Sequence, residues 1–388
     1  MQVNIEVQCM LDKNFRGIPT YTTTLLNHLV RRNKNQYSVS FFDYQKERNN
    51  KEKLCAHISK EWMPRIIFNE CNSDSYKTII DNSRRDLDKI LENNYTDYFD
   101  HKADVYHFPH SITIGANLPP RTVVTVHDII PIIFAGKGFC SPAVEMSFLN
   151  SQKYLQQRKD IAIIADSQST KADLIHYLNM DEERISTIYP SYNEDVCYFE
   201  ENDDTLKKYV IHSPYILYIG ALDPRKGIVD VVKAFGMIQE KNKNLSLVLV
   251  GQCDQQFKEV QWIKSLPYAD KIIFTGYVTD CEKRHFLSAA EVFLFPSVYE
   301  GFGIPVLEAM ACGCPVITTN VSSLPEVGGD AALYVPTGRA DLIAERVEEL
   351  LNNGSVRDRC VMLGYQQIKK FSWEQTAQLT EQVYETLV

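Results

Sequence analysis

The sequence predicts an α/β protein made of two doubly wound domains, each a parallel sheet covered by helices. Three observations support this fold class. The chain has 388 residues, more than one hydrophobic core usually holds. Short apolar runs alternate with helical patterns, as expected where helices connect parallel strands. Several of these runs are apolar throughout, which is typical of strands that are covered on both faces.

The first half of the chain contains five expected strands, which lie within residues 3–10, 37–42, 104–108, 122–128 and 161–167. A helix is expected over residues 21–32, after a loop that contains Gly17. The segment from Asp43 to about His101 is polar and charged. Because it has few strand signals, we expect helices and loops there.

The second half repeats the alternation with six expected strands, within residues 215–221, 245–251, 271–276, 292–297, 315–320 and 332–336. The stretch 191–214 between the two series is polar and has no strong period. We therefore expect a first domain over residues 1–195 and a second over residues 196–370. In such domains ligands bind at the carboxyl ends of the strands, so a site is expected in a cleft between two facing domains.

Composition and charge exclude several classes of protein. The formal net charge of −9 argues against a dedicated nucleic-acid binder. The sequence has no apolar run of 18 residues and no signal-peptide pattern at its start, so we expect a cytoplasmic protein. None of the ten cysteines forms a CxxC pair, so no metal site is expected. Arg31, Arg32 and Lys34 offer a small basic patch for an anionic membrane, although a solvated helix face is the favoured interpretation.

The turn after the strand at 215–219 carries two adjacent cations. Gly220 ends the strand, and Arg225 and Lys226 stand where the next helix is expected to begin. Cations are electrostatically misplaced at a helix N-terminus, which already carries partial positive charge. A solvated turn is one interpretation. The other is a site for a phosphate or diphosphate, held by the cations and the helix amides.

Two carboxylates flank a glycine-rich loop later in the chain, in “EGFGIPVLE”. Glu300 precedes Gly-Phe-Gly, Pro305 suits the first turn of a helix, and Glu308 falls about one turn inside it. Carboxylates accept hydrogen bonds from sugar hydroxyls, although Glu308 could simply complement the helix dipole. A glycosidase would also show two carboxylates, but it needs no cationic turn. Together, the acidic loop and the cationic turn favour an activated sugar with a diphosphate leaving group.

Two features of the first half are weaker signals. A lone Gly17 after the first strand is at least as easily explained by a plain turn, and no GxGxxG follows any strand. His127 and Asp128 end the strand at 122–126. A lone His-Asp pair is structural about as often as functional, but its place at a strand's carboxyl end favours function.

These motifs, in this order, resemble those of glycosyltransferase family 4, the retaining sugar-nucleotide transferases of the GT-B fold with two Rossmann-like domains. The resemblance covers almost the whole chain. Within the family, the chain resembles mannosyltransferases and rhamnosyltransferases. “EGFGIPVLE” matches the family's E-x7-E signature, and “GALDPRKG” resembles its phosphate turn. “RGIPTYTTTLL”, “VVTVHDIIP” and “IIADSQSTKADL” are similar to its N-terminal landmarks. “FSWEQTA” resembles the motif before a C-terminal helix, here 371–388, that crosses back to the first domain.

The resemblance implies a role for each candidate residue. Glu300 would bind hydroxyls of the transferred sugar and Glu308 the ribose, while Arg225 and Lys226 would hold the diphosphate and stabilise its charge. His127 would lie near the reaction centre. The remaining donor contacts would come from Gly17, Gly220, the backbone of Tyr277 and Val278, and the amides of Phe302 and Gly303. Ala221 stands where many members of the family carry an arginine.

The resemblance also implies a reaction. In this reaction a hexosyl group would pass from a UDP- or GDP-linked sugar to a glycan or lipid-linked acceptor. No metal or other cofactor would be needed, and the product would belong to bacterial surface polysaccharide synthesis. Contact with the inner face of the cell membrane would be peripheral. A sugar-nucleotide epimerase of the same fold and a non-catalytic sugar-nucleotide-binding subunit remain as alternatives.

Overall fold

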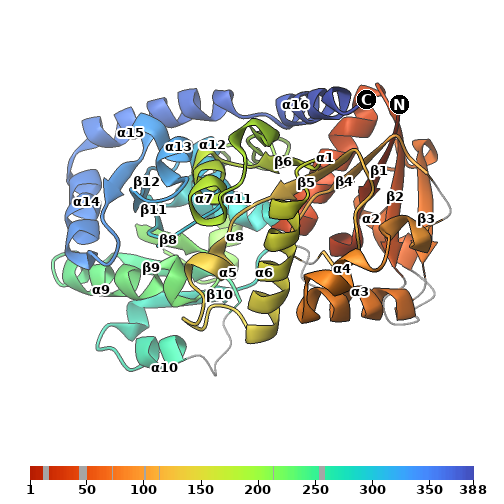
Figure 1. Cartoon of the computed structure of the whole chain (residues 1–388). Coiled ribbons are helices and arrows are strands. Elements are labelled where there is room, and N and C mark those ends of the chain that lie inside the picture. Colours follow the sequence, from red (N-terminus) through yellow and green to blue (C-terminus); the bar gives the residue numbers. More distant parts are fainter. Residues whose placement is uncertain are drawn as a thin grey trace. The chain divides into compact units, whose positions relative to one another are not determined.

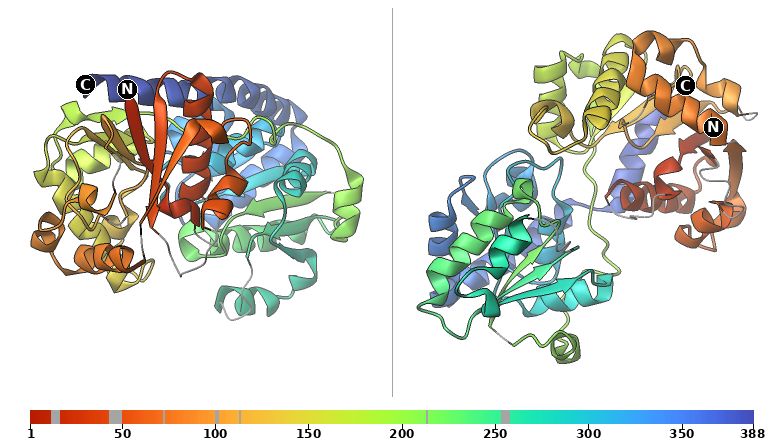
Figure 2. Two further views of the ribbon diagram at one scale, coloured as in Figure 1. Left: turned by 90° about the vertical axis from the view of Figure 1, so that its right-hand side faces the viewer. Right: turned by 90° about the horizontal axis from the view of Figure 1, so that it is seen from below.

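The chain divides into two compact units. The computed structural model describes residues 1–11, 17–42, 50–71, 73–99, 102–112, 114–212, 214–252 and 258–388. The first unit consists of Met1–Pro190 together with Trp373–Val388, and the second of Ser191–Ser372. Figures 1 and 2 show helices on both sides of the sheet in each unit, which is the doubly wound arrangement that the sequence predicts.

The first unit is built on a seven-stranded sheet with the order β3-β2-β1-β4-β5-β6-β7, and every neighbouring pair is parallel. The strands are β1 (Gln2–Glu6), β2 (Gln36–Phe42), β3 (Ile66–Cys71), β4 (Val105–Phe108), β5 (Thr122–Val126), β6 (Ala162–Ala165) and β7 (Ile185–Thr187). The order reverses between β1 and β4, so this edge is the switch point at which doubly wound sheets bind ligands.

Two of these strands were not expected from the sequence. Strand β3 lies in the polar segment for which only helices and loops were predicted, and that prediction was wrong. Strand β3 is at the edge of the sheet and only partly buried, so its residues IIFNEC lack the apolar run of a central strand. Strand β7 is the opposite edge strand, and its residues IST include one apolar side chain, too few for a recognisable pattern.

Helices cover both faces of this sheet. They are α1 (Ile18–Arg32), α2 (Asn50–His57), α3 (Ser73–Arg85), α4 (Leu87–Leu91), α5 (Ile130–Ile133), α6 (Pro142–Gln157), α7 (Gln168–Leu178) and α16 (Trp373–Thr386). Helix α1 begins three residues before the expected start, because Pro19 fits the first turn of a helix. No helix among the described residues is long and apolar enough to cross a membrane.

The last helix of the chain, α16, packs against the first helix, α1 (Figure 1). The carboxylate of Glu381 is fully buried there and accepts hydrogen bonds from Arg32 Nε at 2.8 Å and from the Tyr37 hydroxyl at 3.1 Å. Arg32 also pairs with Glu374, and Lys34 pairs with Glu385. Acidic residues of α16 therefore compensate two of the three cations in the basic patch that the sequence suggested for membrane contact.

We expect Arg32→Met to destabilise the first unit by about 3 kcal/mol, because it leaves the buried Glu381 carboxylate with only a neutral partner. Lys34→Met is the matched control. It removes an exposed ion pair, so its effect should stay below about 1 kcal/mol. Urea unfolding of the three proteins measures both changes. Equal stability losses in the two variants would show that the burial of Glu381 is not what matters.

The second unit has a six-stranded parallel sheet with the order β10-β9-β8-β11-β12-β13. The strands are β8 (Tyr215–Ile219), β9 (Ser246–Val250), β10 (Ile272–Gly276), β11 (Val292–Phe295), β12 (Val316–Thr319) and β13 (Leu333–Val335). The sequence predicted all six. The strand order reverses between the neighbouring strands β8 and β11. The loops that follow these two strands therefore meet at the carboxyl edge of the sheet.

The helices of the second unit are α8 (Asp203–Lys208), α9 (Ile228–Gln239), α10 (Lys258–Lys264), α11 (Asp280–Ala289), α12 (Ile304–Ala311), α13 (Leu324–Gly328), α14 (Ala340–Asn352) and α15 (Gly354–Gln367). Helices α9 and α14 pack on each other, and their buried aliphatic side chains share one core with those of β8, β9, β11 and β12. This core fixes the strand ends from which the candidate site residues project.

Candidate active site

The cationic turn of the second unit follows β8 and lies against the end of β11. Arg225 and Lys226 belong to a short 3-10 turn, Pro224–Lys226, which Asp223 caps by accepting the Lys226 N–H at 3.1 Å. The α-helix α9 starts two residues later, so the cations precede the helix that they were expected to begin.

Gly227 fixes the position of this turn. Its φ of 72° lies in the left-handed region, and a Cβ atom there would come within 2.2 Å of the Pro296 carbonyl oxygen. Only glycine therefore lets the turn approach the end of β11 so closely. The contact places the side chains of Arg225 and Lys226 beside the loop that carries Glu300.

The structure brings Arg225, Lys226 and Glu300 together. Lys226 Nζ lies 2.5 Å from Glu300 Oε1. Arg225 Nη1 lies 3.9 Å from the same oxygen and donates a hydrogen bond to the Tyr299 carbonyl at 3.0 Å. All three side chains are at most 18% exposed. Two cations and one carboxylate therefore form a shielded cluster in which electrostatic interactions are stronger than in water.

Two serines that were not among the predicted site residues support the Glu300 loop. Ser322 Oγ accepts the Glu300 N–H at 3.0 Å, while Ser323 Oγ lies 3.0 Å from the Glu300 carbonyl oxygen and 2.6 Å from that of Phe302. Ser322 has a φ of 50°, which is unusual for a residue other than glycine and often marks a functional site. The one feature of the sequence that could have indicated these two residues is the Ser-Ser pair just beyond the carboxyl end of β12.

The glycine loop leads into α12 as the sequence predicts. Gly303 has a φ of 111° and is the N-cap, and Pro305 lies in the first turn. A Cβ atom on Gly303 would lie only 3.0 Å from Leu324 of α13, so the loop is also packed tightly. Phe302 is buried, and its carbonyl oxygen lies 2.6 Å from Ser323 Oγ.

Glu308 has a partner that the sequence did not reveal. Its Oε1 lies 2.6 Å from Nζ of Lys283, which projects from α11. Burial opposes the charge of Lys283, but the interaction with Glu308 outweighs it, so the pKa of Lys283 lies above its ordinary value. Each glutamate of the E-x7-E signature is thus held by its own lysine, and only one of these lysines was a candidate.

Tyr277 and Val278 directly follow β10, at the same carboxyl edge of the sheet. The Tyr277 side chain is 67% exposed, whereas Val278 is buried. Gly220 follows β8 and donates its N–H to the Val250 carbonyl at 3.0 Å. These residues therefore line the edge on which Glu300 and Lys226 lie, and their contacts with a donor remain a prediction.

In the first unit, His127 lies at the carboxyl end of β5 and contacts a carboxylate other than the predicted Asp128. Its Nδ1 lies 2.9 Å from Asp166 Oδ2, and its Nε2 lies 2.8 Å from the Pro109 carbonyl oxygen. Burial opposes the charge of His127, but the hydrogen bond to Asp166 outweighs it and raises the pKa of the imidazole. Because both ring nitrogens face acceptors, the arrangement favours the doubly protonated imidazolium.

Asp128 has a structural role, and Gly17 lies at the start of α1. Asp128 Oδ1 accepts the Ile130 N–H at 2.9 Å and so stabilises the turn that precedes α5. Gly17 has a φ of 61° and is the N-cap of α1, with open space where a side chain would project. A ligand could therefore approach the backbone at Gly17, which the family resemblance makes a donor contact. In the described part of the chain, no three His, Cys, Asp or Glu residues are grouped to hold a metal ion.

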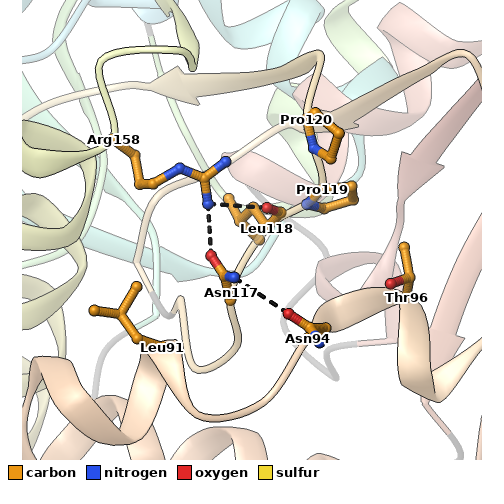
Figure 3. A pocket seen from close by; sticks show the side chains of 8 residues that line it. All are labelled: Leu91, Asn94, Thr96, Asn117, Leu118, Pro119, Pro120 and Arg158. Atoms are coloured by element: carbon orange, nitrogen blue, oxygen red, sulfur yellow. Dashed lines mark hydrogen bonds between the residues drawn. The ribbon is translucent and has the colours of Figure 1, made fainter.

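A pocket of about 360 Å³ lies elsewhere on the first unit (Figure 3). Its lining includes Asn117 and Pro120, which precede β5, so it is at the amino edge of the sheet. Arg158, its one charged side chain, is already paired with Asp160 and donates to Asn117 and to the Leu118 carbonyl. This pocket contains none of the candidate residues and has no uncommitted charge for a ligand.

Comparison with known proteins agrees with the geometry. Residues 15–196 match the family model “Glycosyltransferase Family 4”, and residues 202–367 match “Glycosyl transferases group 1”. The O-antigen chain mannosyltransferase B of Escherichia coli is 32% identical over 302 residues, which cover 76% of each chain. The serotype-specific mannosyltransferase WbdA of the same species is 30% identical over 73% of this chain but only 35% of its own length.

Among solved structures, the sucrose-phosphate synthase of Thermosynechococcus elongatus superimposes with a TM-score of 0.75 over 100% of this chain and 99% of its own. The two sequences are 18% identical, so this similarity concerns the fold alone. It confirms the predicted GT-B architecture of two parallel-sheet α/β domains.

Proposed function

This chain belongs to glycosyltransferase family 4, and from that premise we propose that it transfers a mannosyl group from a nucleoside-diphosphate sugar, with retention of the anomeric configuration. The chain is a glycosyltransferase. Mannose is the proposed sugar because the relatives described above are mannosyltransferases, one of them acting on O-antigen chains. The acceptor is proposed to be a growing surface polysaccharide or its lipid-linked precursor.

The observation that carries the proposal is the cluster of Arg225, Lys226 and Glu300. A nucleoside-diphosphate sugar presents two negatively charged phosphates beside a ring of hydroxyls. The cations match the diphosphate, and the carboxylate matches the hydroxyls. The contact between Lys226 and Glu300 is therefore the one that a bound donor replaces, since each partner then meets its own part of the donor.

The proposed chemistry uses these groups without a covalent enzyme intermediate. The bond between the sugar C1 and the phosphate oxygen breaks, and Arg225 and Lys226 stabilise the negative charge that develops on the diphosphate. The acceptor hydroxyl oxygen bonds to C1 on the same face, and its proton passes to the departing phosphate oxygen. Glu300 holds the sugar hydroxyls throughout, and Glu308 holds the ribose, oriented by Lys283.

A donor screen tests the proposal. We expect GDP-mannose to raise the melting temperature, since a ligand at 100 times its Kd stabilises the native state by about 2.7 kcal/mol. UDP-glucose, UDP-N-acetylglucosamine and dTDP-rhamnose are tested in the same way as alternative donors. The released nucleotide is quantified, and NMR of the product's anomeric carbon reports the configuration. Inversion at C1 would contradict the mechanism, and no stabilisation or nucleotide release with any donor would contradict the function.

A further inference from the structure

Two histidines lie on neighbouring strands near the carboxyl edge of the first unit's sheet, and their hydrogen-bonding surroundings differ. His107 belongs to β4, which pairs with β5, and His127 directly follows β5. His107 is fully buried between two hydroxyls, with Nδ1 2.6 Å from that of Tyr384 and Nε2 2.9 Å from that of Thr125. Because a hydroxyl both donates and accepts, a neutral ring satisfies both contacts. Burial, together with the positive charge of His127, lowers the pKa of His107 to about 3.

The ring of His127 faces two pure acceptors instead. Its Nδ1 lies 2.9 Å from Asp166 Oδ2, and its Nε2 lies 2.8 Å from the Pro109 carbonyl oxygen. A neutral imidazole has one N–H and one lone pair, so here its lone pair would point at an oxygen lone pair. The imidazolium has two N–H groups and satisfies both acceptors. In this arrangement neither nitrogen is left to take a proton or to contact a substrate hydroxyl.

Asp166 keeps the ring in this state. It directly follows β6, the strand beside β5, and its side chain is 6% exposed. Among the described residues, His127 is the one cation paired with Asp166, whose other oxygen, Oδ1, has no hydrogen-bond partner. A buried charge without its partner is costly, so the charge on each residue of the pair depends on the other.

The proton shared by this pair belongs to the ring. Burial opposes the charge of His127, but the hydrogen bond to Asp166 outweighs it, so the pKa of the imidazole rises. Burial also raises the pKa of the Asp166 carboxyl, and the contact with His127 opposes that rise. The proton stays on the imidazole, because a carboxyl starts from a pKa of about 4 and an imidazole from about 6.5.

The other groups that face the ring leave its charge in place. The Asp128 carboxylate also favours the imidazolium. From α1, the Tyr21 ring meets that of His127 edge-on with centroids 4.7 Å apart, and burial raises the pKa of its phenol, so it stays neutral. From α7, the neutral Thr170 donates its hydroxyl to the His127 carbonyl oxygen. The remaining neighbour, His107, is neutral as well.

We propose that Asp166 is a positioning residue for sugar transfer, which holds His127 as an imidazolium with both N–H groups engaged. The charged ring then takes part in transfer without exchanging a proton. The inference rests on the proposed function, in which the acceptor proton passes to the departing phosphate oxygen and no side chain serves as a base. Loss of the Asp166 charge should therefore slow transfer by discharging His127.

The proposal fixes the direction of the pH dependence. The imidazolium exists below the pKa of His127 and is lost above it, so kcat with GDP-mannose and methyl α-mannoside should fall as the pH rises through that pKa. A general base would give the opposite, with kcat rising as the ring loses its proton. In Asp166→Asn the amide can donate to Nδ1, so a neutral ring with its proton on Nε2 is satisfied. The fall in kcat should therefore begin about one to three pH units lower, and acidification should restore transfer.

Nitrogen NMR of protein labelled at histidine reports the ring directly. At neutral pH the His127 signal, assigned by its loss in His127→Gln, should show two protonated nitrogens in the wild type and one in Asp166→Asn. Asp166→Glu keeps the carboxylate, so its pH midpoint should remain that of the wild type. Asp181→Asn is the control, because it removes an exposed carboxylate of the same unit and should change neither measurement.

Three results would overturn the inference. They are a wild-type His127 ring with one proton at neutral pH, a kcat that rises with pH as this ring titrates, and a loss in Asp166→Asn that is the same at every pH, as for a purely structural residue. If Asp166→Asn does not fold, the wild-type pH profile and ring state decide. If no donor is cleaved, the proposed function fails, and the charged state of His127 stands or falls on the NMR measurement.

Discussion

Replacing Lys226 by methionine is expected to lower kcat for sugar transfer by about 10²–10³-fold, the usual cost of removing one group that stabilises a developing negative charge. Methionine keeps the apolar stem and removes the charge. Arg225 does not substitute for it, because its guanidinium lies 3.9 Å from Glu300 and is already bonded to the Tyr299 carbonyl. Initial rates at saturating donor give kcat directly.

Lys241→Met is the control for this substitution. Lys241 forms an exposed ion pair with Glu348 on the same unit, so its loss should leave kcat unchanged. A kcat within threefold of wild type for Lys226→Met would remove this residue from the proposed charge stabilisation and leave Arg225 as its only source.

Replacing Glu300 by alanine is expected to lower kcat/KM by about 10²-fold, because a hydrogen bond to a charged group contributes about 1.5–3 kcal/mol. Glu300→Gln keeps the shape and one acceptor oxygen, so its loss should be smaller. Glu348→Ala, which removes a partly exposed carboxylate of α14, is the control. The double variant Lys226→Met/Glu300→Ala should lose less activity than the product of the single losses, because the two side chains are in contact. Strictly multiplicative losses would show that they act independently.

The sequence predicted the sheets well because most strands are central and therefore apolar. It failed at β3 and β7, two edge strands whose polar residues interrupt the apolar run. The sequence predicted that Glu300 and Lys226 lie at the same edge of the sheet, but not that they are in contact. Both residues follow strands of one sheet, but the distance between them depends on the glycine contact between residues 227 and 296, which no local pattern encodes.

The partners of the candidate residues were harder to predict than the candidates themselves. Lys283 lies within an ordinary polar helix surface, and nothing in that pattern indicates that it meets Glu308. Asp166 was part of a predicted strand segment, whereas Asp128, adjacent to His127 in sequence, was the apparent partner. Side chains on neighbouring parallel strands are distant in sequence, so pairs of this kind emerge only from the register of the sheet.

The docking of α16 on α1 has a consequence for biosynthesis. A ribosome releases the second unit in full before it releases α16, although α16 belongs to the first unit. Until α16 has been synthesised, the Arg32 guanidinium and the Tyr37 hydroxyl of the first unit lack their partner Glu381. The buried His107 ring lacks its partner Tyr384. The first unit is thus completed only after the second unit has been synthesised, when α16 docks on α1.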